Sequence, residues 1–137
     1  MRISQRGLYA LQALTVLARR HPGVVKIHDI AQAEALPEKF LEAILLELKR
    51  ARIVVSLRGA NGGYQLKRSP RTITLSEVIR RIDGPLAPFE DSESLRHRVK
   101  TDAKHRPLFR ILLDVRNATA EILDHTSIAD LCCSSPN

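Results

Sequence analysis

The chain has 137 residues, 44% of them hydrophobic and 27% charged, which is enough for one domain with a core and an appended helix. No apolar run approaches the roughly 20 residues that cross a membrane, and the N-terminus lacks the continuous apolar region of a signal peptide. The net charge is +7, and we expect a cytoplasmic protein without a membrane partner.

The positive charge is concentrated in the first half of the chain. Residues 1–72 hold 13 Lys and Arg against 5 Asp and Glu, a net of +8, whereas residues 73–137 hold 9 against 10, a net of −1. This asymmetry indicates a polyanionic partner for the first half; a basic surface kept only for solubility is the alternative. Three Phe, two Tyr and no Trp offer few rings for stacking single-stranded bases, so duplex DNA is the better match.

The first predicted element is a helix from about Ser4 to Arg20. Ser4 is a favourable N-cap, and an apolar face follows at helical spacing, formed by Leu8, Leu11, Leu14, Leu17 and Ala18. Arg2 and Arg6 flank the helix start, where arginines and a helix N-terminus together suit a phosphate. Ordinary solvated arginines are the alternative.

Two further helices follow, joined by a short turn. His21-Pro22-Gly23 ends the first helix, Val24 and Val25 suit a short edge strand, and a helix is expected over residues 28–34. After the turn at 35–37, Pro37 opens a second helix, because its missing N–H has no intrahelical partner there. This helix runs to Arg50 with an apolar face of Phe40, Leu41, Ile44, Leu45 and Leu48. The pair predicts a helix-turn-helix with the second helix in the recognition position.

The period then changes from helix to strand. Ile53, Val55 and Leu57 alternate with Val54, Ser56 and Arg58, as in a strand, and a second short strand follows at residues 64–66. Between them, residues 58–63 read RGANGG, in which two glycines and an asparagine tolerate positive φ, so a hairpin tip is expected. A helix leading into a hairpin that carries Arg58 describes a winged helix, with the wing reaching the DNA backbone or minor groove. A hairpin that only packs is the alternative.

The second half is predicted to hold one short helix and one long helix. Thr74 and Glu77 suit a capping box for a helix to about Ile82, which Asp83-Gly84-Pro85 ends, and residues 87–106 suit a loop or a weakly ordered short helix. Pro107 opens a helix to about Asp124 whose apolar stripe needs a covering partner. Pairing with a second copy is as economical as packing within the chain. The expected dimerisation residues are Leu108, Ile111, Leu112, Val115, Ala118 and Ile122.

These motifs resemble the Rrf-two (Rrf2) family of bacterial winged-helix regulators over nearly the whole chain. The resemblance rests on MRISQRGLYAL at the start, KFLE at 39–42, LLELKRA at 45–51, the wing VSLRG with GGYQL, ITLSEVIRRIDGPLAP from residue 73, and SIADL at 127–131. It implies a homodimer, built on the long C-terminal helix, that presents two winged helices to a palindromic operator.

The resemblance also implies which residues face DNA. It places recognition-helix residues at bases or backbone, the wing at the minor groove, and the N-terminal segment near phosphates. The implied residues are Glu38, Lys39, Phe40, Glu42 and Ala43; Arg58, Asn61, Gly62, Gly63 and Tyr64; and Arg2, Ser4 and Arg6. The implied fold is mainly α, with a winged helix-turn-helix domain over 1–83, a linker or sensor-like segment over 84–106, the dimerisation helix and closing segment over 107–131, and a tail over 132–137.

The chain departs from the family pattern at the turns and at the sensor. Glycine is usual where Ala35 stands, serine where Pro37 stands, and proline and glycine where Ala60 and Asn61 stand. Cluster-binding members carry three cysteines before the long helix, and here that segment has none. His105, with Asp102 three residues earlier, is a poor soft-metal site, so we expect no cofactor and a structural or solvated His105.

The expected function is therefore a dimeric, sequence-specific repressor of transcription without an iron–sulfur cluster, and not an enzyme. No nucleophile and base pair can be assigned, since five His are scattered and the two cysteines, Cys132 and Cys133, are neighbours near the C-terminus. Two alternatives stay open. DNA affinity could depend on a metabolic enzyme as protein partner, or the adjacent cysteines could sense redox state or metal.

Overall fold

The structure is a computed structural model that describes residues 2–86 and 91–132. In chain order its elements are α1 (Gln5–Arg20), α2 (Ile27–Glu34), α3 (Glu38–Arg50), β1 (Val54–Leu57), β2 (Gly63–Leu66), the 3-10 turn η1 (Pro70–Thr72), α4 (Leu75–Asp83), α5 (Ser92–Thr101), α6 (Arg106–Asp124) and α7 (Ile128–Cys132). None of these helices is long and apolar enough to cross a membrane.

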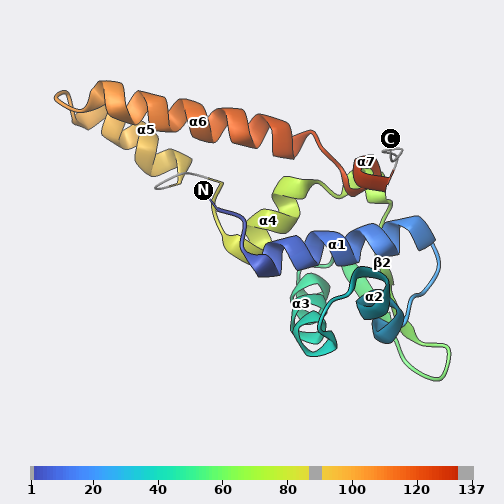
Figure 1. Cartoon of the computed structure of the whole chain (residues 1–137). Coiled ribbons are helices and arrows are strands. Elements are labelled where there is room, and N and C mark those ends of the chain that lie inside the picture. The colour runs from blue at the N-terminus through green and yellow to red at the C-terminus, as the bar shows by residue number, and fades with distance from the viewer. Residues whose placement is uncertain (1, 87–90, 133–137) are drawn as a thin grey trace.

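The elements are arranged around α1 (Figure 1). Helices α2 and α3 and the hairpin of β1 and β2 lie on one side of α1, below it in the view, and α7 packs against its other side. Helices α5 and α6 run side by side as a helical hairpin that projects from the rest of the molecule. The predicted mainly helical winged-helix architecture with a long C-terminal helix is confirmed.

One core holds the winged helix together. It is built from fully buried side chains of α1, α2, α3, the hairpin and α4, with α7 adding one more, and it includes Leu14, Leu17, Ile30, Leu41, Ile44, Leu45, Leu48, Ile53, Val78 and Ile128. Each large side chain buried there contributes roughly 1.5–3 kcal/mol. A second, smaller core of Ile79, Leu86 and Ala120 joins α4 to α6, with Ile3 packed against it.

The wing is a two-stranded antiparallel sheet in which Val54 pairs with Leu66 and Leu57 with Gly63. The expected edge strand is reduced to one residue, Val25, whose N–H and C=O both bond Tyr64 at 2.8 Å. The expected alternation along the first strand is wrong. Ile53 and Val54 are both buried and Leu57 is 43% exposed, because Ile53 closes α3 and the strand begins one residue later.

Helices α2 and α3 end in the same way, on a left-handed residue that is not glycine. At α2 this residue is Ala35, with φ 52°, and the following Leu36 N–H bonds Ala31 O at 2.9 Å. At α3 it is Arg52, with φ 61°, and Ile53 N–H bonds Leu48 O at 3.0 Å. Both are Schellman closures, which usually use glycine because it has no Cβ.

Several local expectations need correction. Ala60 and Asn61 do not adopt positive φ, so the wing tip is not strained where we expected; within the described residues the strain falls on Ala35 and Arg52. Half of the predicted capping box is made: Glu77 N–H donates to Thr74 Oγ1 at 3.2 Å, but the Glu77 carboxylate pairs with Arg68.

Two boundaries in the second half also differ from the expectation. Residues 92–101 form the helix α5, the second of the two options for that segment, because Leu95 is fully buried. Cys132 is the last residue of α7 and not the first of a tail, since α7 packs against α1; Cys133 lies outside the described residues.

The closure at Ala35 makes a prediction about stability. We expect Ala35→Gly to raise the free energy of unfolding by about 0.5–1 kcal/mol. The left-handed conformation costs a residue with a Cβ roughly 1–2 kcal/mol, which glycine avoids. The greater conformational freedom of glycine in the unfolded chain reduces this gain in stability by about 0.4–1 kcal/mol. Urea unfolding followed by circular dichroism measures the difference.

Ala33→Gly is the matched control, because Ala33 lies two residues earlier inside α2. There the same substitution should lower the free energy of unfolding by about 1 kcal/mol. Effects of the same sign at the two positions would contradict a left-handed closure at Ala35.

Candidate nucleic-acid interface

Helix α3 has one buried and one open face. Leu41, Ile44, Leu45 and Leu48 are buried against the core, which leaves Glu38, Lys39, Phe40, Glu42 and Ala43 exposed. Phe40 is 61% exposed, although the sequence pattern had counted it with the apolar face. In a major groove these side-chain types have partners: lysine donates to guanine, glutamate accepts from the cytosine amino group, and a phenylalanine ring contacts the thymine methyl group.

The wing projects from the same side of α1 as α3 (Figure 1). Arg58 and Asn61 are exposed at its tip, where Gly62 N–H bonds Gly59 O at 2.9 Å to close the turn. Two residues predicted to face DNA have a different role here. A Cβ at Gly62 would collide with the backbone of Leu57, and one at Gly63 with the backbone of Val25.

Gly62 is therefore buried, and Tyr64 is half-buried in its bridge to Val25. Gly62 and Gly63 therefore shape the wing, while the side chain of Tyr64 stays partly exposed. Arg58 is the exposed cation that the wing carries at its tip.

The N-terminus of α1 is already occupied by a carboxylate of the chain itself. Ser4 Oγ accepts a hydrogen bond from Gly7 N–H at 3.0 Å, as the sequence predicts, but it also donates to Asp83, and Ser4 N–H donates to Asp83 Oδ2 at 2.9 Å. The Ser4 side chain is thus engaged within the protein. Arg2 and Arg6, which flank it, are exposed.

The exposed cations around these elements include the four predicted to contact DNA: Arg2, Arg6, Lys39 and Arg58. Within residues 2–86 and 91–132 their side chains make no hydrogen bond or ion pair. The acidic residues nearby are partly engaged, since Glu38 lies 3.5 Å from His28 Nδ1 and Glu47 lies between Arg50 and Arg81. The arrangement leaves positive charge free for an anionic partner.

Helix α6 presents three faces. Phe109 and Ala120 are buried against the chain, and Arg110, Asp114, Asn117 and Glu121 form an exposed polar face. Between these faces runs a stripe that we name the apolar stripe: Leu108, Ile111, Val115, Ala118 and Ile122. All five are exposed, with Ile111 at 61% and Ile122 at 67%, whereas Leu112, also expected at the dimer seam, is half-buried. Nothing in the described chain covers the stripe.

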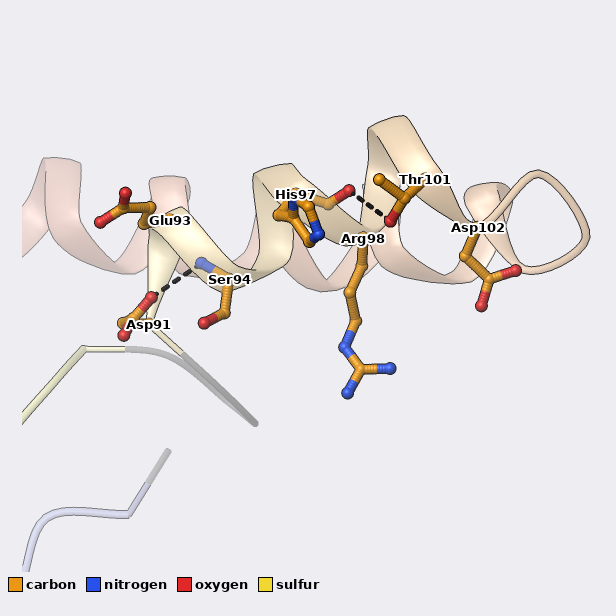
Figure 2. A pocket seen from close by; sticks show the side chains of 7 residues that line it. All are labelled: Asp91, Glu93, Ser94, His97, Arg98, Thr101 and Asp102. Atoms are coloured by element: carbon orange, nitrogen blue, oxygen red, sulfur yellow. Dashed lines mark hydrogen bonds between the residues drawn. The ribbon is translucent and has the colours of Figure 1, made fainter.

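The segment before α6 forms an open cleft of about 710 Å³ along α5 (Figure 2). It is lined by Asp91, Glu93, Ser94, His97, Arg98, Thr101 and Asp102. Asp91 and Asp102 lie at opposite ends of it, so their carboxylates do not converge.

His105 is engaged by Asp102 at the turn into α6. Asp102 accepts from the backbone N–H of His105 at 3.0 Å and lies 3.1 Å from its Nδ1. These two hydrogen bonds hold the pKa of Asp102 below its ordinary value, and the bond from the backbone N–H of His105 has the larger effect. The contact is a local cap at the turn into α6, and His105 itself is exposed.

Comparisons with known proteins identify relatives over the whole chain. A family model described as "Rrf2: Iron-dependent Transcriptional regulator" matches residues 3–134. The chain is 38% identical to the HTH-type transcriptional regulator CymR of Bacillus subtilis over 132 residues, 96% of this chain and 89% of that protein. It is 48% identical to an rrf2-like HTH-type regulator of Rhodobacter capsulatus over 91 residues, 64% of this chain and 61% of that protein.

Solved structures give the same relationship. The structure of CymR (YrzC), the global cysteine regulator of B. subtilis, superposes with a TM-score of 0.85 at 32% identity and covers 99% of both chains. The structure of T. potens IscR superposes with a TM-score of 0.69 at 29% identity, covering 100% of this chain and 94% of that one.

The iron in the family description has no fitting donor set in the part of the chain that the structure describes. There, no three His, Cys, Asp or Glu side chains come together in an arrangement for a metal ion. Cys132 Sγ lies 3.7 Å from Thr15 O on α1. His105 is the N-cap of α6, whereas α7 lies beyond the C-terminal end of α6 (Figure 1). Iron–sulfur clusters need several thiolates or imidazoles on one site, and these residues are not so placed.

Proposed function

Because the chain belongs to the Rrf2 family of DNA-binding transcriptional regulators, we propose that it acts as a homodimer that binds a palindromic operator and represses transcription without a resident iron–sulfur cluster. The observation that carries the proposal is the coexistence of two open surfaces on one chain. Unpaired cations surround α3 and the wing, and the apolar stripe of α6 is uncovered.

In this proposal each residue has a role that its exposure permits. Glu38, Lys39, Phe40, Glu42 and Ala43 lie along the major groove, where Lys39, Phe40 and Glu42 read base edges. Arg58, with Asn61 beside it, enters the minor groove, where the negative potential attracts arginine. Arg2 and Arg6 contact phosphates and fix the register of the protein on the duplex.

The dimer follows from the apolar stripe. Side chains that recur every three and four residues along a helix pack against the same stripe on a second helix, which a twofold axis supplies. Two winged helices related by that axis suit a palindromic operator.

DNA binding through α3 and the wing is tested with a duplex selected in vitro from a random pool. We expect the affinity of the selected duplex to fall by roughly 10³ or more between about 50 and 200 mM salt, since the dimer should contact on the order of 6–10 phosphates. Arg58→Ala should weaken binding substantially, because the wing loses the cation that the minor groove attracts; fluorescence anisotropy measures the loss.

The control is Arg71→Ala, which removes the same charge from η1, a segment that packs against α7 on the other side of α1. It should leave affinity nearly unchanged. If Arg58→Ala, Arg6→Ala and Lys39→Ala all bind the duplex as the wild type does, the interface lies elsewhere.

Dimerisation through the apolar stripe is tested with Ile111→Asp. The substitution would bury an unpaired carboxylate at the seam and cost several kcal/mol, so analytical ultracentrifugation should show monomers or unfolded protein. Asn117→Asp places the same group on the exposed polar face of α6 and should stay dimeric. An Ile111→Asp dimer that binds DNA normally rules out this seam.

Absence of a cluster is tested by anaerobic purification after expression with ample iron. We expect no stoichiometric iron or sulfide and no cluster absorption in the visible spectrum, because the segment before α6 has no cysteine. Stoichiometric iron and sulfide that survive Cys132→Ser with Cys133→Ser would contradict this. Iron that disappears in that double variant would move the sensor to the C-terminal cysteines.

A further inference from the structure

The contact between Ser4 and Asp83 joins two segments that are 79 residues apart in the chain. Both oxygens of the Asp83 carboxylate are used: Oδ2 accepts from Ser4 N–H at 2.9 Å, and Oδ1 accepts from Ser4 Oγ. The same Oγ accepts from Gly7 N–H at 3.0 Å, so the carboxylate holds the first turn of α1 through the serine. The electrostatics are favourable, because a negative charge lies at the positive end of a helix dipole.

Two further features show that this part of the chain is built for the contact. A Cβ at Gly7 would lie 2.6 Å from Asp83 Oδ2, so only glycine leaves room for the carboxylate there. Ile3 packs against the small core of Ile79, Leu86 and Ala120, which anchors the residue before Ser4 as well. The N-terminal segment is thus fixed on α4 by one apolar and one polar contact.

The position of Asp83 gives the contact a functional meaning. Asp83 is the last residue of α4, and Gly84 and Pro85 lead from it toward α5 and α6. Arg2 and Arg6 lie on either side of Ser4, and both are exposed. Because Asp83 already occupies the N-terminus of α1, a phosphate there would meet the arginine side chains and not the helix N–H groups.

We propose that Asp83 is a positioning residue of the DNA interface, which holds Ser4 so that Arg2 and Arg6 face phosphates. The inference rests on the proposed DNA binding and extends it to a residue that touches no DNA.

The test compares two variants that break the contact by different means. Asp83→Asn removes the charge and one acceptor, whereas Gly7→Ala keeps every charge and displaces the carboxylate. Alanine favours a helix more than glycine does, so Gly7→Ala keeps α1 intact even if Asp83→Asn unfolds. Thermal unfolding and sedimentation identify variants that are folded dimers.

The readout is the salt dependence of binding to the selected duplex and, in parallel, to a duplex of scrambled sequence. Each lost phosphate contact lowers the slope of log affinity against log salt by about 0.9, so a dimer that loses Arg2 and Arg6 contacts should lose about 2–4. We expect both variants to match Arg2→Ala/Arg6→Ala, and Gly7→Ala combined with that pair to show no further loss. A contact that only stabilises the fold would leave the slope of the folded variants unchanged.

Asp124→Asn is the charge-matched control. Asp124 on α6 pairs with Arg80 on α4 at 3.2 Å. Asp124→Asn makes the net charge more positive by the same amount as Asp83→Asn, and that change by itself favours DNA binding. We expect the wild-type slope for it. The inference is overturned, and the proposed function is left standing, by either of two results. One is a wild-type slope in folded Gly7→Ala and Asp83→Asn; the other is a loss of slope that adds fully to the loss in Arg2→Ala/Arg6→Ala. A wild-type chain that binds neither duplex overturns the proposed function and this inference with it.

Discussion

Burial of α1 is the constraint on which the rest of the structure depends. This helix contacts α2, α3, α4, β2 and α7, and its Leu14 and Leu17 are completely removed from solvent. Helix α3 and the wing are positioned by packing on or beside α1, while the unpaired cations lie at the periphery of that packing. The separation is physically sensible, since apolar contacts set the geometry and the charges remain hydrated until a partner displaces the water.

Much of the fold could be predicted because it is encoded in local patterns. The periodicity of α1, α3 and α6, the N-cap at Ser4 and the hairpin around Arg58 each depend on residues close together in sequence. The exposed faces of α3 and α6 follow from the same periodicity. Phe40 and Leu8 are exceptions among the apolar residues assigned to buried helix faces, since Phe40 is 61% and Leu8 49% exposed.

What could not be predicted depends on contacts between distant segments. The pairing of Ser4 with Asp83 crosses most of the chain, and no spacing rule connects them. Arg52 adopts a left-handed conformation at a position where the sequence has no glycine to indicate it. The close approach of the Leu57 backbone to Gly62 also cannot be predicted from the sequence. The helix α5 has weak periodicity, and its stability comes from Leu95 packing in the helical hairpin and from an Asp91 cap that its composition only partly suggests.

The way α6 is attached has a consequence for the operator. Its C-terminal half is fixed to the winged helix through Ala120, and the chain that follows it bonds α4 through Leu75 N–H to Thr126 O at 2.9 Å and the loop before α4 through Ile128 N–H to Ile73 O at 2.9 Å. In a dimer paired along α6, these attachments would fix the distance between the two recognition helices. One base pair added between the half-sites shifts the second half-site by about 3.4 Å and rotates it by about 35°. A dimer with a fixed distance between its recognition helices cannot bind both half-sites after that change.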